Sequence, residues 1–268
     1  MLDRFWHQFL RRPYKLHVEK YGAPSLPVVI LLHGIGASGE DWKHFLPELT
    51  KHYHCISVDL LGCGRSPKPQ WLGYFPDDHS KSLRATIRSL RLDNFILIGH
   101  SLGALLATSY ASRYPLSIER LILLSPPVYP PVTRIRNHLA RQRTGVLMAI
   151  YRAMQKSFVT PELIGRLAFI LPPAKYIKEN SEGWLPAMRT LEHCIEQQTV
   201  LEDIQKVAMP VDVWYGLLDE VVIGTNIQLL ATHHPKTKIH TYGGRHLLTK
   251  QYAQAFCAWF LRDTTASR

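Results

Sequence analysis

The sequence has no hydrophobic run long enough to cross a membrane. A spanning helix needs about 20 predominantly apolar residues, and no run in these 268 residues approaches that length. The amino terminus also lacks the apolar stretch of a secretory signal, because Asp3, Arg4, His7 and Gln8 interrupt its hydrophobic residues. We therefore expect a cytoplasmic protein without a membrane-spanning helix.

Cysteine is also scarce, with four residues whose spacing suggests no pairing: Cys55, Cys63, Cys194 and Cys257. This usage favours reduced thiols over a disulfide framework. The histidines show no H-E-x-x-H or other zinc-binding spacing. A chain of this length buries enough surface to fold without such supports, so we expect no metal and no cofactor.

Negative charge is in short supply. The chain has 32 Lys and Arg against 21 Asp and Glu, a net charge of +11, which favours anionic partners through its field. It has no zinc-finger or RNP motif, so we expect no nucleic acid partner. The 46% hydrophobic and 20% charged residues are typical of a globular protein and exclude disorder.

Short apolar runs alternate with helical patterns along the chain. Buried strands are predicted at 28–32, 55–58, 95–98, 121–124, 211–215 and 238–242, after an antiparallel edge strand within 14–20. Helices are predicted at 81–92, 102–114 and 247–261. Continuous apolar strands separated by helices indicate an α/β fold whose mostly parallel sheet has helices on both faces.

This alternation stops between Ser125 and Pro210. Prolines open the stretch in two pairs, Met209-Pro210 closes it, and helical patterns without a buried strand lie between them. We predict a core formed by 1–125 and 210–268, with a helical lid at 126–209. The lid would cover the carboxyl edge of the sheet, where α/β proteins bind ligands.

A nucleophile motif follows the strand predicted at 95–98. Gly99-His100-Ser101-Leu102-Gly103 is a G-x-S-x-G sequence placed between a strand and a helix. Such a turn holds a serine hydroxyl clear of the sheet, and the flanking glycines accommodate its strained backbone. This context favours Ser101 as a nucleophile over an incidental loop serine.

The remaining parts of an acyl-transfer site follow other strands. Asp219 and His246 each come shortly after a late strand and complete the order Ser, Asp, His. The alternatives are a turn or capping residue for Asp219 and a helix-cap neighbour for His246. The backbone amides of Ile35 and Leu102 are the expected oxyanion donors, with a packing turn as the alternative at 33–36.

Five motifs in this order resemble the α/β-hydrolase superfamily, in particular its lidded bacterial esterases. His33-Gly34-Ile35-Gly36-Ala37-Ser38 is similar to the family's H-G-x-G-x-S oxyanion loop. Asp59-Leu60-Leu61-Gly62-Cys63-Gly64-Arg65-Ser66 is similar to its D-x-x-G-x-G-x-S loop. The resemblance spans almost the whole chain and implies the α/β-hydrolase fold and a Ser101–His246–Asp219 triad.

We expect an enzyme that hydrolyses small carboxylic esters. Serine at position 101, instead of aspartate, disfavours dehalogenase and epoxide hydrolase chemistry. Gly36-Ala37-Ser38 and Leu102-Gly103-Ala104 differ from the G-P-G and M-G-G of many carbon–carbon bond hydrolases. Carbon–carbon hydrolysis of dienoic diketone acids remains an alternative, as do perhydrolase chemistry and a ligand receptor without turnover.

Two surface features leave partners open. The predicted lid carries Arg134, Arg136, Arg141, Arg143, Arg152 and Lys156, and no acidic residue occurs from 126 to 161. A solvated helix face is favoured over attraction of an anionic substrate or an acidic carrier protein.

At the amino terminus, Leu2, Phe5, Trp6, Phe9 and Leu10 fit one helical face before Arg11-Arg12. Packing on the domain or on a second subunit is favoured over a membrane-surface helix. Nothing in the sequence specifies an oligomeric state.

Overall fold

A seven-stranded sheet forms the centre of the computed structural model, which describes residues 5–155 and 181–266. Its spatial order is β1 (Val18–Tyr21), β3 (His54–Val58), β2 (Val28–Leu32), β4 (Phe95–His100), β5 (Ile118–Leu124), β6 (Val211–Gly216) and β7 (Thr237–Tyr242). Strand β1 pairs antiparallel with β3 at one edge, and all other pairs are parallel. The predicted strands and the antiparallel edge are confirmed.

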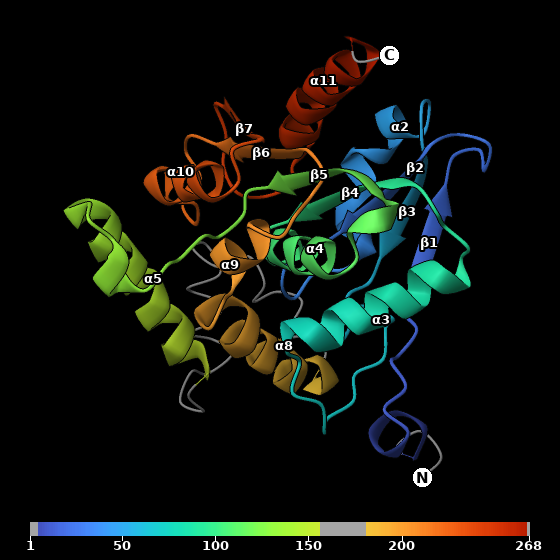
Figure 1. Cartoon of the computed structure of the whole chain (residues 1–268), viewed down its shortest axis with the longest axis horizontal. Helices are drawn as coiled ribbons and strands as arrows, with labels where there is room; N and C mark the ends of the chain where they lie inside the picture. Colours follow the sequence, from blue (N-terminus) through green and yellow to red (C-terminus); the bar gives the residue numbers. More distant parts are fainter. Residues whose placement is uncertain (1–4, 156–180, 267–268) are drawn as a thin grey trace.

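Helices cover both faces of the sheet (Figure 1). On one face lie α3 (Pro76–Ser89) and α4 (Leu102–Arg113), and on the other lie η2 (Gly39–His44), α2 (Leu46–Leu49) and α11 (Lys250–Ala266). Alternate residues of β2 serve the two faces: Ile30 and Leu32 pack toward α4, whereas Val29 and Leu31 pack toward α11. Helix α10 (Gly224–His233) connects β6 to β7.

Helix α3 begins earlier than the predicted range of 81–92. Its first residue is Pro76, and the Asp78 carboxylate accepts a hydrogen bond of 3.0 Å from the Phe75 amide. Proline at the first position and acidic residues in the first turn both stabilise a helix start. The apolar periodicity alone therefore located the helix and missed its first turn.

Every regular element that the structure describes between β5 and β6 is a helix. These elements are η4 (Val132–Arg134), α5 (His138–Gln155), η5 (Ser181–Gly183), α8 (Trp184–Thr190), η6 (Leu191–Glu196) and α9 (Val200–Ile204). The chain leaves the carboxyl end of β5 and runs to α5, at the left of Figure 1. Lys156 lies outside the described residues, and Arg152 forms an ion pair with Glu196 at 3.0 Å.

The insertion is attached to the loop that precedes α3. Arg189 donates from Nη1 to the carbonyl oxygens of Gln70 and Leu72, both at 2.7 Å. The ring of His193 hydrogen-bonds the Gly73 carbonyl at 2.7 Å and stacks on Phe75 with centroids 3.9 Å apart. These contacts join α8 and η6 to the core at a point well separated from β5 and β6.

The first described residues form a short helix, η1 (Phe5–Phe9), with no buried side chain. Phe5, Trp6, Phe9 and Leu10 are 41–75% exposed, so these side chains are not buried against the domain, and their packing on a second subunit stays a prediction. Leu2 lies outside the described residues.

No helix in the described part of the chain is long and apolar enough to span a bilayer. All four cysteines are free.

Candidate active site

Ser101 lies on a sharp turn between β4 and α4. Its backbone has φ 53° and ψ −120°, a conformation that L-residues rarely adopt. The flanking glycines are required because a side chain at either position would collide with the neighbouring backbone. A Cβ on Gly99 would lie 2.2 Å from the carbonyl oxygen of Gly103, and one on Gly103 would lie 2.4 Å from that of Leu32. The turn therefore needs both glycines of the G-x-S-x-G sequence.

A continuous chain of hydrogen bonds joins the three side chains that the sequence singled out. His246 Nε2 lies 3.0 Å from Ser101 Oγ, and His246 Nδ1 lies 2.9 Å from Asp219 Oδ2. All three residues are buried. Because a carboxylate only accepts, Nδ1 carries the proton, and Nε2 is left to accept from the serine hydroxyl.

Asp219 is held in its ionised form. The amides of Val221 and Val222 donate to Oδ1 at 2.9 and 3.0 Å. Burial acts to raise the pKa of this carboxyl, but its interactions with His246 and the hydrogen bonds from Val222 and Ser125 outweigh burial. The net pKa is lower than usual. The buried carboxylate can therefore orient and electrostatically support an imidazole.

The loop expected to supply an oxyanion donor borders the serine. A Cβ built on Gly34 would lie 3.4 Å from Ser101 Cβ, which places the Gly34–Ile35 turn beside the hydroxyl. Leu102 is the first residue of α4. Its amide, like the other amides of a helix start, has no acceptor four residues back in the helix. His33 braces the turn: Nδ1 bonds the Gly34 carbonyl at 2.7 Å, and Nε2 accepts from the Leu60 amide at 2.9 Å.

The D-x-x-G-x-G-x-S sequence folds around the buried Asp59. Its carboxylate accepts from the amides of Gly39 at 2.7 Å and Arg65 at 2.8 Å, and Ser66 Oγ donates to the Asp59 carbonyl at 2.6 Å. A Cβ on Gly64, whose φ is +49°, would lie 2.3 Å from the carboxylate. This motif joins the loops after β2 and β3, and through His33 it supports the turn beside Ser101.

His100 has a contact that the sequence did not predict. Its Nε2 lies 2.9 Å from the backbone carbonyl oxygen of His246. Burial lowers the pKa of His100 to about 3, with a further contribution from His246, so the ring is neutral and donates from Nε2. His100 thus fixes the backbone of the residue that reaches Ser101. The two histidines are 146 positions apart, so local sequence carries no signal of the contact.

Two more residues without a sequence signal support Asp219. Ser125, at the end of β5, contributes a hydrogen bond that lowers the pKa of Asp219, and its hydroxyl lies 3.2 Å from that of Tyr252. Tyr129 donates from its hydroxyl to the Val221 carbonyl at 2.7 Å. The start of the insertion is therefore bonded to the loop that holds the carboxylate.

The fold and this geometry agree with a family comparison. Residues 27–163, about half of the chain, match the model of the alpha/beta hydrolase fold. The chain belongs to the alpha/beta hydrolase fold family. We therefore class it as a hydrolase of this family. Within its described residues, no group of three or more His, Cys, Asp or Glu side chains is arranged to hold a metal ion.

Two curated relatives of this hydrolase differ in how fully they are matched. "Probable lysophospholipase BODYGUARD 4" of Arabidopsis thaliana is 27% identical over 82% of this chain, but the match covers 51% of that protein. The chain thus spans about half the length of this relative. The "2-hydroxy-6-oxo-2,4-heptadienoate hydrolase" of Pseudomonas putida is 22% identical, with 80% of both chains covered.

Solved structures confirm the fold of this hydrolase. The enol-lactonase from Burkholderia xenovorans is 18% identical and superposes with a TM-score of 0.70 over 93% of this chain and 96% of that one. A bacterial membrane phospholipase A is 19% identical, with a TM-score of 0.70 over 94% and 88% of the two chains. At this identity, the likeness concerns the arrangement of strands and helices.

Proposed function

We propose that the chain is a serine hydrolase that cleaves small carboxylic esters through an acyl-enzyme. The observation that carries the proposal is the unbroken chain of hydrogen bonds from Asp219 through His246 to Ser101, with 2.9 and 3.0 Å at its two links. A buried carboxylate, an imidazole in a fixed tautomer and a strained serine form an activated nucleophile.

In the acylation step, Ser101 Oγ attacks the ester carbonyl carbon while His246 Nε2 takes its proton. The oxyanion of the tetrahedral intermediate accepts from the amides of Ile35 and Leu102. His246 then gives the proton to the departing alkoxide, so the alcohol leaves and the acyl group stays on Ser101. Asp219 stabilises the imidazolium that exists between these transfers.

In the deacylation step, a water molecule takes the place of the alcohol. His246 Nε2 removes a proton from that water as the oxygen attacks the acyl carbonyl carbon. The same two amides receive the second oxyanion. Its collapse breaks the bond to Ser101 Oγ, which regains the proton from His246, and the carboxylic acid departs. Atoms and protons balance over the cycle, and no cofactor takes part.

Relatives named as a probable lysophospholipase and an enol-lactonase support ester cleavage as the reaction. The insertion at 126–209 is proposed as the lid that selects the acyl and alcohol groups. In support, Tyr129 near its start is bonded to the loop that carries Asp219. An anionic ester is one candidate substrate class, because the net charge of +11 favours anionic partners.

A second candidate function has a specific observation behind it. The Pseudomonas putida hydrolase, whose name gives a heptadienoate substrate, matches this chain over 80% of both lengths. The same nucleophile and base can serve carbon–carbon bond hydrolysis of a dienoic diketone acid. Ester and dienoate substrates must therefore be tested side by side.

The decisive experiment is a steady-state screen of nitrophenyl esters graded by acyl length. A lysophospholipid and a dienoic diketone acid complete the panel, and Ser101→Ala serves as the blank. Ester turnover that disappears in the blank supports the proposal. Turnover of the dienoate alone selects carbon–carbon hydrolysis. Stoichiometric binding without turnover indicates a receptor on this scaffold.

A further inference from the structure

A hollow lined by arginines lies at the amino edge of the sheet, opposite the site of Ser101. It has a volume of about 630 Å³ and is bordered by the second half of α3, the end of α4 and η3 (Pro115–Ser117). We call it the arginine groove, after its four basic lining residues: Arg84, Arg88, Arg91 and Arg113. Helix α4 runs from Ser101 to the groove, and at 1.5 Å per residue its length separates the two by about 18 Å.

Three of these arginines lie along α3 and its end. Arg84 and Arg88 are four residues apart on one face of α3, and Arg91, with φ 56°, lies just beyond the helix and lines the same hollow. None of the three has an ion-pair partner within the described part of the chain, and Asp93 is the acidic residue among those that line the hollow. Like charges at this spacing repel one another. The lining therefore concentrates positive charge at Arg84, Arg88 and Arg91, with Asp93 as the acidic residue beside them.

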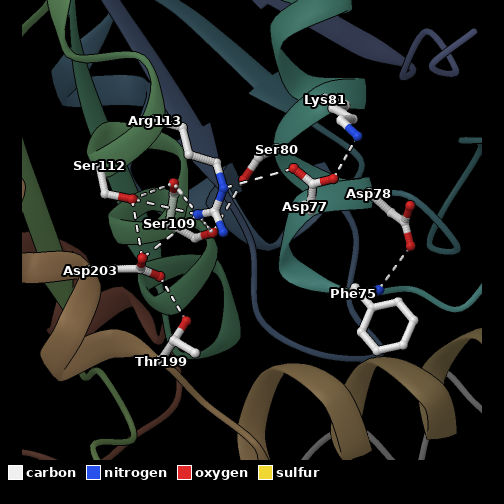
Figure 2. Close-up of polar contacts among 10 residues, drawn as sticks. All are labelled: Phe75, Asp77, Asp78, Ser80, Lys81, Ser109, Ser112, Arg113, Thr199 and Asp203. Atoms are coloured by element: carbon white, nitrogen blue, oxygen red, sulfur yellow. Dashed lines mark hydrogen bonds and ion pairs between the residues drawn. The ribbon is translucent and has the colours of Figure 1, made fainter.

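The opposite wall holds its arginine firmly. Arg113 Nη1 donates to the Ser109 carbonyl at 2.8 Å and to Ser109 Oγ at 2.6 Å (Figure 2). Its guanidinium also lies 3.8 Å from both Asp77 and Asp203. Across the groove, the Arg84 guanidinium lies 4.0 Å from the ring centroid of Tyr114. Arg84 is thus positioned before any ligand arrives, whereas Arg113 is already paired with two carboxylates and contributes to the wall of the groove.

We propose that the arginine groove binds an anion that carries phosphate groups. Guanidinium groups donate in pairs to phosphate oxygens, and several of them around one hollow match a diphosphate or a phosphorylated headgroup. The volume lies in the range of small-ligand sites. The groove is remote from Ser101, so its occupancy does not depend on the proposed ester hydrolysis.

The first experiment titrates the full chain with inorganic pyrophosphate by calorimetry at low salt. The test variant carries Arg88→Gln and Arg91→Gln, two exposed residues whose side chains form no hydrogen bond or ion pair within the described part of the chain. The matched control carries Arg136→Gln, an exposed arginine on the insertion. We expect the double variant to bind about 10- to 100-fold more weakly and the control to bind as the wild type does.

Thermal unfolding separates lost binding from lost folding. Without anion, the double variant should unfold at or above the wild-type temperature, because the repulsion along α3 is relieved. At one hundred times the wild-type Kd, pyrophosphate should raise the wild-type Tm by about 5–10 °C and that of the double variant by at most about half as much. Equal pyrophosphate affinity in all three proteins, or no binding by the wild type, would overturn the proposal.

A vesicle arm distinguishes the sources of the phosphate. Phosphatidylcholine vesicles with and without phosphatidic acid are sedimented with each protein. Retention that requires phosphatidic acid, is lost in the double variant and is competed by pyrophosphate identifies a lipid headgroup. Pyrophosphate binding without such retention identifies a soluble phosphate compound. Retention that is unchanged in the double variant contradicts a role for the groove.

Discussion

The two ends of β6 each carry a buried aspartate bonded to a histidine. Near the amino end, Asp212 Oδ1 lies 2.8 Å from His240 Nε2, and Arg120 Nε donates to Oδ2 at 2.7 Å. Beyond the carboxyl end, Asp219 bonds His246. In both cases burial alone acts to raise the carboxyl pKa, but the bonded partners lower it below its usual value.

The surroundings of each histidine distinguish the two pairs. The ring of His240 packs 4.5 Å from that of Trp259, and Arg120 extends the network to Asp263 at 2.6 Å, so the amino-end network joins strands and helix α11. The other nitrogen of His246 reaches Ser101 Oγ on a strained turn. An aspartate–histidine pair is therefore not a mark of catalysis. The hydroxyl at its far end, at the carboxyl edge of a parallel sheet, makes the difference.

The largest expected effect comes from removing that hydroxyl. Ser101→Ala should lower kcat for a nitrophenyl ester by about 10⁶-fold, because the nucleophile of a comparable triad contributes that much. The kcat of the purified variant is measured, and thermal unfolding checks that the variant is folded. A folded variant that retains a tenth of the activity would contradict the assignment.

Identical substitutions at the two aspartates give the next contrast. Asp219→Asn should lower kcat by about 10⁴-fold, because an amide no longer enforces the productive tautomer of His246. Asp212→Asn is the matched control on the same strand and should leave kcat of the folded enzyme within a few fold. Equal losses in the two variants would show that the comparison of the pairs is mistaken.

The free energy of unfolding should depend strongly on Asp212, the aspartate whose replacement leaves kcat nearly unchanged. Asp212→Asn leaves the partly buried Arg120 with a weaker partner, and disrupting a buried ion pair costs about 3–5 kcal/mol. Urea unfolding measures the loss. The wild type gains this stability above the ~3.9 at which an unfolded aspartate titrates and loses it as pH falls through the lower native pKa. The difference from the variant should therefore shrink in acid, and a difference that does not shrink as pH falls below the ~3.9 of an unfolded aspartate would rule out this cause.

A smaller effect is expected from His100, which positions His246. His100→Phe keeps a ring but removes the donor to the His246 carbonyl, and misplacement of a catalytic base by about 1 Å can cost 10²-fold in rate. We expect kcat to fall about 10- to 100-fold with KM little changed. His100→Gln can still donate and should restore much of the rate. Equal losses in both variants would indicate a packing role instead.

The smallest effect concerns the basic insertion. Arg141 donates two hydrogen bonds to the Ile135 carbonyl, at 2.9 and 2.7 Å, so replacing it would disturb the structure. The test therefore changes Arg134, Arg136 and Arg143 and leaves Arg141 in place. If these arginines line the entrance, their reversal to glutamate should lower kcat/KM about 2- to 10-fold for an ester with a free carboxylate and leave a neutral ester unchanged. The difference should fade between about 0.02 and 0.5 M salt. Parallel responses of both esters would favour a solvated face.

The sequence predicted the strands, the antiparallel edge and the helical insertion because buried apolar runs and proline pairs are local signals. Ser101, Asp219 and His246 could be located for a related reason: the carboxyl ends of parallel strands converge, whatever their separation in the chain. The contacts of His100, Ser125 and Tyr129 could not be predicted. Each joins segments that only the packed fold brings together, and no spacing or composition records such a pairing.

The attachment of the insertion has a consequence for how this chain tolerates sequence change. Arg189 and His193, and Cys194 at 3.4 Å from the Tyr74 carbonyl, all bond main-chain oxygens between Gln70 and Tyr74. Every amino acid supplies such an oxygen, so these bonds do not depend on the loop's side chains; the Gln70 side chain adds one bond of its own, from Nε2 to the Glu182 carbonyl at 2.9 Å. The side chains of Lys68, Pro69, Trp71 and Leu72 can therefore vary while the insertion keeps its place, and a library confined to these four positions should yield mostly folded proteins.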